Sequence, residues 1–230
     1  MSYFDSMVRP CLLDRIKVKD DIFNGGIFNG LEYQVVTNPV TGRTWLDRNL
    51  GATRVATSSN DPDAYGWLYQ WGRLSDGHQI RTSAITAILS STDQPGHGDF
   101  IQTPLASEDW RNPSNDALWQ GIDSINNPCP PGFRLPTVSE WASERSTWSN
   151  NFLEAAYNGI LKLTAHGWRN SGGVVSNVGQ LALFWTIERG LSSTIATNFD
   201  IRFSGTSVFR DTQGRVLGMA VRAIRDEQFD

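Results

Sequence analysis

Between Ile195 and Ser204 the run IATNFDIRFS changes between apolar and polar side chains at almost every step. A period of two is typical of a β-strand with one buried face, because successive side chains point to opposite sides of a sheet. A helix would need a period near 3.6. The run therefore predicts a strand whose Asn198 and Asp200 face solvent, in a sheet against which the rest of the chain packs.

Other short β-rich runs surround turn signals. Residues 31–47 read LEYQVV, NPVTG and RTWLD, which predicts a hairpin because Pro and Gly favour the turn between two strands. Near the C-terminus we expect a hairpin turn at residues 212–214 and a final strand through Val221 and Ile224. The run GILKLT, residues 159–164, predicts one more strand. Antiparallel strands with a few helices indicate an α+β fold.

Two segments carry helical signals. Residues 62–74, PDAYGWLYQWGRL, have apolar side chains near helical spacing and predict a short amphipathic helix. A second helix is expected after Thr137, which can accept a hydrogen bond from the main chain of Glu140 while Glu140 reaches back, as in a capping box. Trp141 and Trp148 fall near the apolar face of this second helix.

The sequence divides into an arm and a domain. Residues 1–30 mix apolar and charged side chains without a sustained period and end in the turn-rich run FNGGIFNG. This arm is too apolar for a free tail, so we expect it to dock on its own domain or on a neighbouring subunit. Residues 31–230 form the domain. Within the domain, residues 75–127 are polar and irregular, and their two tryptophans favour an ordered insertion.

Composition limits the classes of partner. The net charge is −4 and Lys and Arg do not cluster, which argues against nucleic acid because phosphate binding needs concentrated positive charge. No apolar run approaches the roughly 20 residues of a membrane span. No signal peptide is visible, so we expect assembly inside a cell. Nine tryptophans and eleven phenylalanines favour a β-rich core.

The sequence gives little support for catalysis. Cys129 lies among prolines and apolar residues, which favours a buried thiol over a reactive one. With Cys11 it makes two cysteines in unlike contexts, so both are expected to be reduced. No local signature of a catalytic triad, a zinc protease or a phosphate-binding loop occurs. We therefore expect a protein that is not an enzyme and carries no cofactor.

Metal binding is equally weakly indicated. The three histidines, His78, His97 and His166, lack the short spacings of zinc sites and lie in contexts that favour solvated side chains. A structural calcium ion in the loops remains an alternative, because carboxylate oxygens are its usual ligands. The candidate ligands are Asp61, Asp63 and Asp93.

Seven stretches occur in the order found in one known family. They are EYQVVTNPVTGRTWLDRNLG, YGWLYQWGR, DWRNPSNDALWQG, NPCPPGFRLPTVSEW, LKLTAHGWRN, FWTIERG and GMAVRAIRD. In this order they resemble the Fibrobacter succinogenes major paralogous domain family, itself similar to the C-type-lectin-like and formylglycine-generating-enzyme fold. The resemblance spans about residues 31–226. It implies a C-type-lectin-like fold with twisted antiparallel sheets, two short helices and long ordered loops.

The chain departs from this family at its end. The family's closing Val-Arg-Cys is Val221, Arg222 and Ala223 here, so Cys129 lacks the partner that the resemblance implies. No cysteine follows Cys129, which argues against the two-cysteine copper site of formylglycine-generating enzymes. The calcium-binding loop of sugar-binding lectins is also missing, since residues 94–96 read QPG without the carboxylate.

The resemblance and the lack of a signal together imply a non-enzymatic virion protein of a phage. It would be a structural or receptor-binding component of the tail or capsid, located in the virion, and would contact a host-surface glycan or protein. The alternatives are a decoration protein that contacts only virion proteins, a secreted bacterial surface-binding module and, last, a formylglycine-generating-type enzyme. Virion symmetry favours a homo-oligomer, joined to its own subunits or to other virion proteins through residues 1–30.

By analogy with C-type-lectin-like binders, the ligand surface would lie on the late strands and loops. Flat aromatic rings beside hydrogen-bonding groups are typical of such contact surfaces. The expected ligand-binding residues are Trp110, Arg111, Trp119, Glu188, Arg189, Asn198, Asp200, Arg202 and Phe209.

Overall fold

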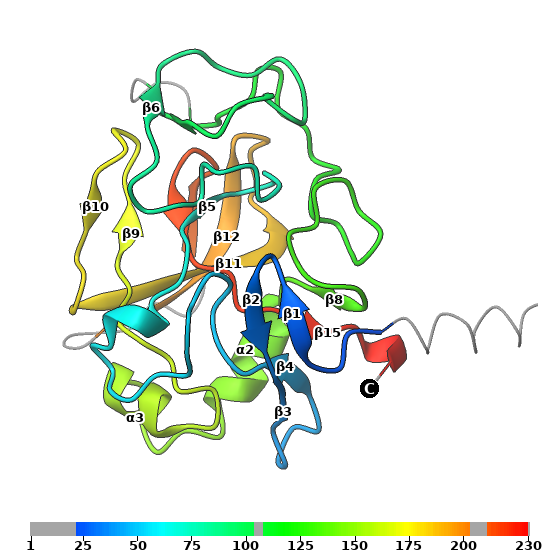
Figure 1. The fold of residues 1–230 in the computed structure, drawn as a ribbon, viewed down its shortest axis with the longest axis vertical. Coiled ribbons are helices and arrows are strands. Elements are labelled where there is room, and N and C mark those ends of the chain that lie inside the picture. Colours follow the sequence, from blue (N-terminus) through cyan, green and yellow to red (C-terminus); the bar gives the residue numbers. More distant parts are fainter. Residues whose placement is uncertain (1–21, 104–107, 203–210, 230) are drawn as a thin grey trace, which may run out of the picture.

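The computed structural model describes residues 22–103, 108–202 and 211–229, and most of this chain runs in loops between short strands (Figure 1). The two longest strands are β11 (Leu181–Arg189) and β12 (Ile195–Arg202). The other elements are β1 (Gly26–Phe28), β2 (Leu31–Tyr33), β3 (Val35–Thr37), β4 (Thr44–Leu46), η1 (Pro62–Ala64), β5 (Tyr69–Gln70), β6 (Ile85–Thr86), β7 (Phe100–Ile101), β8 (Phe133–Arg134), α2 (Val138–Arg145), α3 (Leu153–Asn158), β9 (Trp168–Arg169), β10 (Val175–Ser176), β13 (Asp211–Gly214), β14 (Gly218–Met219), β15 (Ile224–Arg225) and η2 (Glu227–Phe229).

The strands form small sheets that are mostly antiparallel. The larger sheets have the orders β11-β12-β13, β10-β9-β14-β5 and β3-β4-β15-β8, and two further pairs are β1-β2 and β6-β7. Only the β6-β7 pair is parallel among the strand pairs of the described residues. Antiparallel sheets with two helices in the described part of the chain agree with the expected α+β class at this coarse level.

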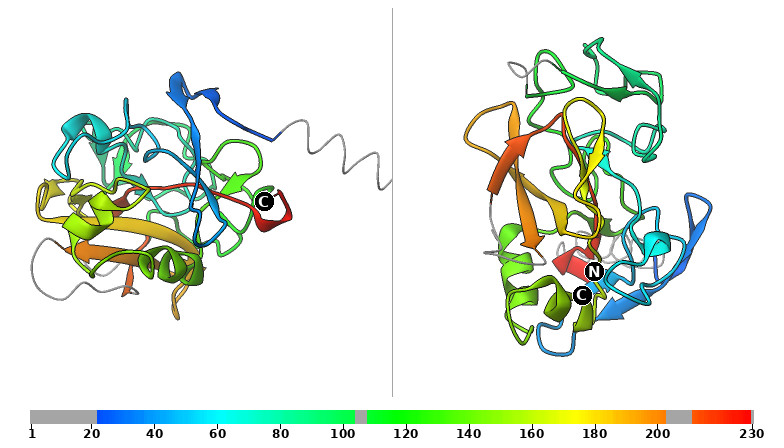
Figure 2. Two further views of the ribbon diagram at one scale, coloured as in Figure 1. Left: turned by 90° about the horizontal axis from the view of Figure 1, so that it is seen from below. Right: turned by 90° about the vertical axis from the view of Figure 1, so that its left-hand side faces the viewer.

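The β11-β12 pair separates two apolar cores. On one face α2 packs against the sheet, where Trp141 stacks on Phe199 with ring centroids 4.7 Å apart and planes 5° apart. On the other face, Leu183 and Trp185 join a cluster that contains Tyr69 of β5. In the right-hand view of Figure 2 these long strands, coloured yellow to orange, lie toward one side of the molecule. Both cores therefore depend on the same pair of strands.

Burial of β12 on both faces corrects the expectation of a solvent-exposed side. Residues 195–202 do form a strand, which confirms the period-two prediction. However, Asn198 and Asp200 are almost fully buried, because β12 lies between β11 and β13 and its polar side faces the second core. The alternation of apolar and polar residues identifies the polar face of the strand. It does not show whether that face is exposed to solvent or covered by other parts of the protein.

Four other local predictions were wrong in whole or in part. The expected final strand covers only Ile224–Arg225 as β15, and Val221 lies outside it. Residues 62–74 form only the single turn η1 and then β5, because Gly66 adopts a φ of +74° and its backbone lies too close to the Leu50 carbonyl for a side chain. Residues 159–164 form no strand, although they are described throughout. Residues 212–214, expected as a turn, belong to strand β13 and pair with β12.

Two other local predictions are confirmed. The hairpin within residues 31–47 is present as the pair β3-β4, with Val36 opposite Trp45. Helix α2 begins after Thr137, and the Thr137 hydroxyl accepts a hydrogen bond from Glu140 N while Glu140 accepts one from Thr137 N. Two of the main-chain amides at the start of the helix are thereby satisfied.

The described end of the expected arm packs on the domain. Phe23 N donates to Pro131 O at 3.1 Å, and the Phe23 ring contacts Phe133 of β8 edge to face. Strands β1 and β2 pair across residue 30, the boundary expected between arm and domain. Residues 1–21 of the arm lie outside the described residues.

Removing the Trp141 side chain tests the dependence of the fold on the α2 core. Trp141→Ala is expected to lower the free energy of unfolding by about 3–5 kcal/mol, because the cavity that it leaves cannot collapse between two strands and a helix. Urea denaturation followed by circular dichroism measures the change. Val40→Ala is the control, since Val40 is 76% exposed and its truncation should change stability by less than about 0.5 kcal/mol. Equal effects of the two substitutions would contradict this account of the core.

Candidate functional site: the surface of the 116–125 loop

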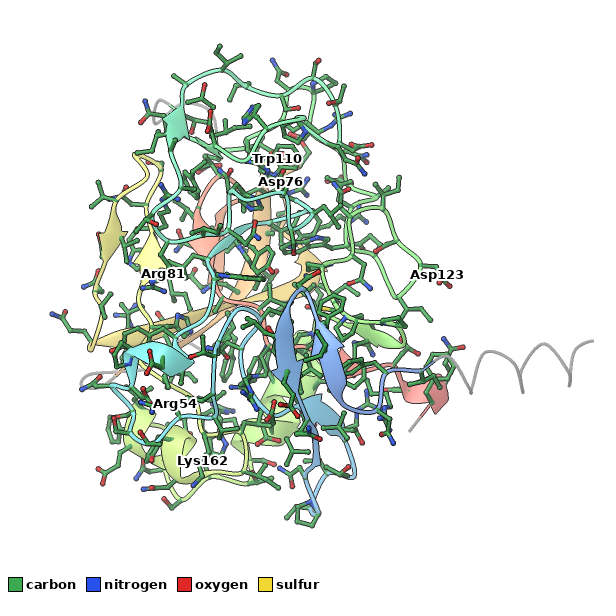
Figure 3. The ribbon with its side chains drawn as sticks, viewed as in Figure 1. Arg54, Asp76, Arg81, Trp110, Asp123 and Lys162 are labelled. Atoms are coloured by element: carbon green, nitrogen blue, oxygen red, sulfur yellow. The ribbon has the colours of Figure 1, made fainter. Side chains whose placement is uncertain are left out.

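The two tryptophans expected to bind ligand are buried anchors. Trp110 donates its indole N–H to Trp71 O at 2.7 Å, and Trp119 donates its own to Asn126 O at 2.7 Å. Both side chains are fully buried, and Figure 3 shows Trp110 inside the loops rather than at the rim. Neither ring offers a face to a ligand. Their role in the structure is to hold the polar segment 75–127 onto the second core.

Arg111 and Glu188 also serve the fold. The Arg111 guanidinium lies 2.9 Å from an Asp93 carboxylate oxygen and contacts Pro113 O. Glu188 accepts a hydrogen bond from Val138 N at 2.7 Å, in the first turn of α2, where a carboxylate is favoured by the helix dipole. Arg111 thus holds residues 93 and 113 together. Glu188 holds the start of α2 to the end of β11.

The remaining expected residues fall into separate places. Asp200 is buried and accepts two hydrogen bonds from Arg202, whose side chain is partly exposed. Asn198 is on the same side of β12 and is buried too. Phe209 lies outside the described residues. Among the expected residues that the structure describes, Arg189 is the one that joins the exposed 116–125 loop, through its pair with Asp116.

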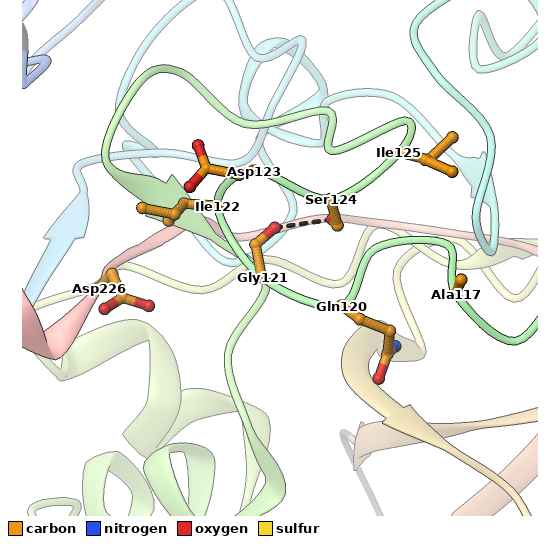
Figure 4. Close-up of a pocket in the computed structure, with 8 residues that line it drawn as sticks. All are labelled: Ala117, Gln120, Gly121, Ile122, Asp123, Ser124, Ile125 and Asp226. Atoms are coloured by element: carbon orange, nitrogen blue, oxygen red, sulfur yellow. Dashed lines mark hydrogen bonds between the residues drawn. The ribbon is translucent and has the colours of Figure 1, made fainter.

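That surface is formed by the loop of residues 116–125, by Arg189 at the end of β11, which pairs with Asp116, and by Leu191 in the turn that follows β11. We call it the loop surface. The loop encloses an open depression of about 510 Å³, shown in Figure 4. Ile122 and Asp226 lie at one end of the depression, and Ala117 and Ile125 at the other. The lining residues are Ala117, Gln120, Gly121, Ile122, Asp123, Ser124, Ile125 and Asp226. The depression thus combines small apolar groups with hydrogen-bonding groups.

Buried hydrogen bonds fix the shape of the loop from below. Asn126, which adopts a φ of +64°, donates to Gly72 O at 2.9 Å and to Asp93 O at 2.6 Å. Gln120 donates to Ile187 O of β11 at 3.0 Å. The loop is therefore tied both to its own neighbouring segments and to the end of the central sheet.

An ion network joins the loop to the late strands. Asp116 pairs with exposed Arg189 at 3.1 Å and with buried Arg215 at 2.5 Å. The Arg215 guanidinium also lies over the Trp71 ring, 4.4 Å from its centroid, and 3.8 Å from Asp109. Burial raises the pKa of Asp109 to about 6, and the nearby hydrogen bonds and Arg215 offset only part of this effect.

The buried histidines and the cysteine are committed to packing. His78 accepts a hydrogen bond from Gln70 N and has its other ring nitrogen 2.6 Å from Asp76, and burial lowers its pKa to about 4. Burial lowers the pKa of His166 to about 3. The expectation of solvated side chains was wrong for these two histidines. Cys129 is buried, as expected, and burial raises the pKa of its thiol.

The carboxylates considered for calcium are engaged by cations of the chain itself. Asp61 accepts two hydrogen bonds from Arg54, and these lower the pKa of its carboxyl. Asp63 lies 3.3 Å from the same arginine, and Asp93 is paired with Arg111. Within the described residues no group of three or more His, Cys, Asp or Glu side chains could hold a metal ion.

Comparisons with known proteins leave the family of the chain open. No family model matches the sequence, and neither the curated proteins nor the solved structures contain a significant match. Among the described helices, none has the length and apolar character needed to cross a membrane.

Sequence reasoning missed most of the loop surface, because its residues are ordinary polar and small apolar types. The run DALWQGIDSI contains a tryptophan, and a buried tryptophan often anchors a loop whose neighbours are then exposed. Reading Trp119 as an anchor would have directed attention to Asp116, Gln120 and Asp123 beside it.

Substitution of Asn126 tests whether the loop is held in place from below. Asn126→Ala removes two hydrogen bonds to buried carbonyls and is expected to cost roughly 1–3 kcal/mol of stability. Peptides that cover residues 116–127 should exchange amide hydrogens faster, whereas peptides from α2 should be unchanged in hydrogen-exchange mass spectrometry. Gln120→Val is a milder control from the same loop, because the two hydrogen bonds that it removes, to Leu118 O and Ile187 O, come from an exposed side chain. Unchanged exchange in Asn126→Ala would show that the anchor is unnecessary.

The raised pKa of Asp109 predicts a pH-dependent contribution to stability. Because its pKa is about 6 in the folded state and about 3.9 when unfolded, the carboxyl favours folding below about pH 4 and loses this effect as the pH rises through 6. Relative to Asp109→Asn, the wild-type chain should lose up to about 3 kcal/mol between pH 4 and pH 7. Urea denaturation across this range measures the difference, and Asp123→Asn controls for the change in net charge. A constant difference across this range would contradict the prediction.

Proposed function

We propose that the chain is a non-enzymatic, virion-associated binding protein of a phage that contacts a host-surface ligand through the loop surface. In this proposal the domain has the C-type-lectin-like fold, and residues 1–30 attach it to its own subunits or to other virion proteins. The observation that supports ligand binding most directly is a rigidly held loop whose exposed side chains carry no role in the core.

The distribution of polar groups supports binding over catalysis. Several buried ionisable side chains of the described domain hold main-chain groups by hydrogen bonds, as His78 does with the Gln70 amide. At the loop surface, Gln120 holds the loop to Ile187 O, and Asp123 is exposed beside the depression. A preformed loop loses little conformational entropy when a partner binds, which favours recognition.

The composition of the loop surface supports a protein ligand or a glycan held by hydrogen bonds. The only aromatic residue of the 116–125 loop is Trp119, whose ring is buried, so sugar stacking on this loop has no platform. Leu191 is fully exposed two residues from Arg189, and Ile125 is 48% exposed on the loop. Apolar side chains next to an arginine and polar groups are typical of the core and rim of a protein contact.

The test is binding of the labelled full chain to intact cells of the bacterial strain that carries or supports the phage. Arg189→Gln and Leu191→Ser are expected to weaken binding at least tenfold, because both change exposed side chains of the loop surface. Lys162→Gln and Val40→Ser are matched controls that remove the same charge and a similar apolar group elsewhere on the surface. Blocking of infection by the free protein should show the same dependence.

Two outcomes would contradict the proposal. No saturable binding to cells at micromolar protein would leave the decoration role, in which the surface contacts only virion proteins. Equal losses in the matched controls would show that the loop surface is not the contact. Co-purification of the chain with capsid or tail proteins, with no binding to cells, would favour the decoration protein.

A further inference from the structure

A buried arginine connects the interior of the domain to the loop surface. Arg215 is 1% exposed, and its guanidinium donates to Asp116 at 2.5 Å and to Asn115 O at 3.4 Å. Asp116 in turn accepts a hydrogen bond at 3.1 Å from Arg189, whose side chain is exposed. A continuous series of charged groups therefore runs from the inside of the domain to the start of the 116–125 loop.

The buried carboxylate of Asp109 competes with Asp116 for this guanidinium. It lies 3.8 Å from Nη1 of Arg215, which is close enough for attraction but beyond hydrogen-bond distance. The next residue, Trp110, is fully buried and donates its indole N–H to Trp71 O, so this segment is fixed in place. Asp109 is therefore held beside Arg215 whether or not its carboxyl carries a charge.

The other groups around Asp109 come mostly from its own segment. The Ser114 hydroxyl and the main-chain amide of Arg111 donate to its carboxylate, while the Arg111 guanidinium pairs with another aspartate. Glu108, the preceding residue, is exposed. Among the described side chains, Arg215 is the cation that pairs with Asp109. A change of charge on Asp109 therefore acts first on Arg215.

The charge of this carboxyl changes close to neutral pH. Burial raises the pKa of Asp109 to about 6, so the group is mostly neutral at about pH 5 and mostly ionised above about pH 7. While the carboxyl is neutral, Asp116 receives the whole attraction of Arg215. Once it is ionised, Asp109 shares Arg215 with Asp116 and repels Asp116 as a like charge. Ionisation therefore weakens the hold of Arg215 on the start of the 116–125 loop.

We propose that the ionisation of Asp109 regulates the loop surface, which binds its ligand more tightly when Asp109 is neutral. Arg215 transmits the change, because it holds Asp116 and Asp116 holds Arg189 at the surface. A firmly held loop loses less conformational entropy when a ligand binds. By linkage, a bound ligand favours the neutral carboxyl to the same extent. This inference rests on the proposed binding function of the loop surface.

A carbon-13 NMR titration of the Asp109 carboxyl in the full chain tests the coupling without a ligand. Asp116→Asn should lower the pKa of Asp109 by about one pH unit, because Arg215 is then no longer shared. Arg189→Gln should raise this pKa, because Asp116 loses a cation and then competes more strongly for Arg215. The two substitutions are thus expected to shift the pKa in opposite directions, which a merely structural role of the network would not produce.

Asp123→Asn is the matched control for this titration. It removes the same charge as Asp116→Asn from an exposed side chain of the same loop, so the pKa of Asp109 should not change. Arg189→Gln alters an exposed side chain and is expected to fold normally, which keeps the test valid if Asp116→Asn unfolds the chain. An unchanged pKa in Arg189→Gln, or equal shifts in Asp116→Asn and Asp123→Asn, overturns the proposal.

Binding of the labelled full chain to cells at about pH 5 and about pH 7.5 tests the regulation itself. The wild-type chain should bind about fivefold more tightly at the lower pH, and Asp109→Asn, whose side chain stays neutral, should lose this dependence. Titration of the ligand's own groups would affect both proteins alike, so their difference isolates Asp109. Saturable binding with the same pH dependence in both proteins overturns the regulation alone. Absence of binding at either pH contradicts the proposed function, and the regulation with it.

Discussion

Buried arginines that donate to main-chain carbonyls hold this structure together. The strands are short, so much of the backbone near the cores has no strand partner, yet a buried carbonyl without a donor is costly. Arg169 and Arg222 each donate to several such groups, and Arg222 joins Leu46 O and Leu161 O from distant parts of the chain. The planar guanidinium has five donors in fixed directions, which suits it to this task. Burial lowers the pKa of Arg222 to about 10, a sign of the desolvation that these bonds must offset.

The use of buried polar side chains in the fold also limits which side chains are available to bind a ligand. Many polar side chains inside the domain hold main-chain groups or one another, so His78, Asp76 and Glu188 stabilise segments instead of facing a ligand. Other side chains are exposed at the periphery, as on the 116–125 loop. The interior and the surface therefore have different tasks.

The sequence predicted those elements whose signals are local. The capping box of Thr137 and Glu140, the hairpin in residues 31–47 and the strand at residues 195–202 each depend on neighbours within a few positions. The predictions failed where distant contacts decide. Residues 62–74 have helical spacing, but the close approach of Gly66 to Leu50 O excludes the helix. The burial of Asn198 depends on which segments cover β12. Of the expected ligand residues that the structure describes, only Arg189 presents its side chain at the loop surface, because tertiary packing assembles that surface.

Four indole N–H groups donate to main-chain oxygens in the second core, from Trp71, Trp110, Trp119 and Trp185. Each of these side chains does two things at once, since it fills volume and donates a hydrogen bond to a main-chain carbonyl. Phenylalanine could fill the volume but could not donate the hydrogen bond. These positions should therefore tolerate little variation, even though the residues between them can change freely. The spacing of fixed tryptophans and variable polar stretches would allow new binding surfaces to evolve on an unchanged frame.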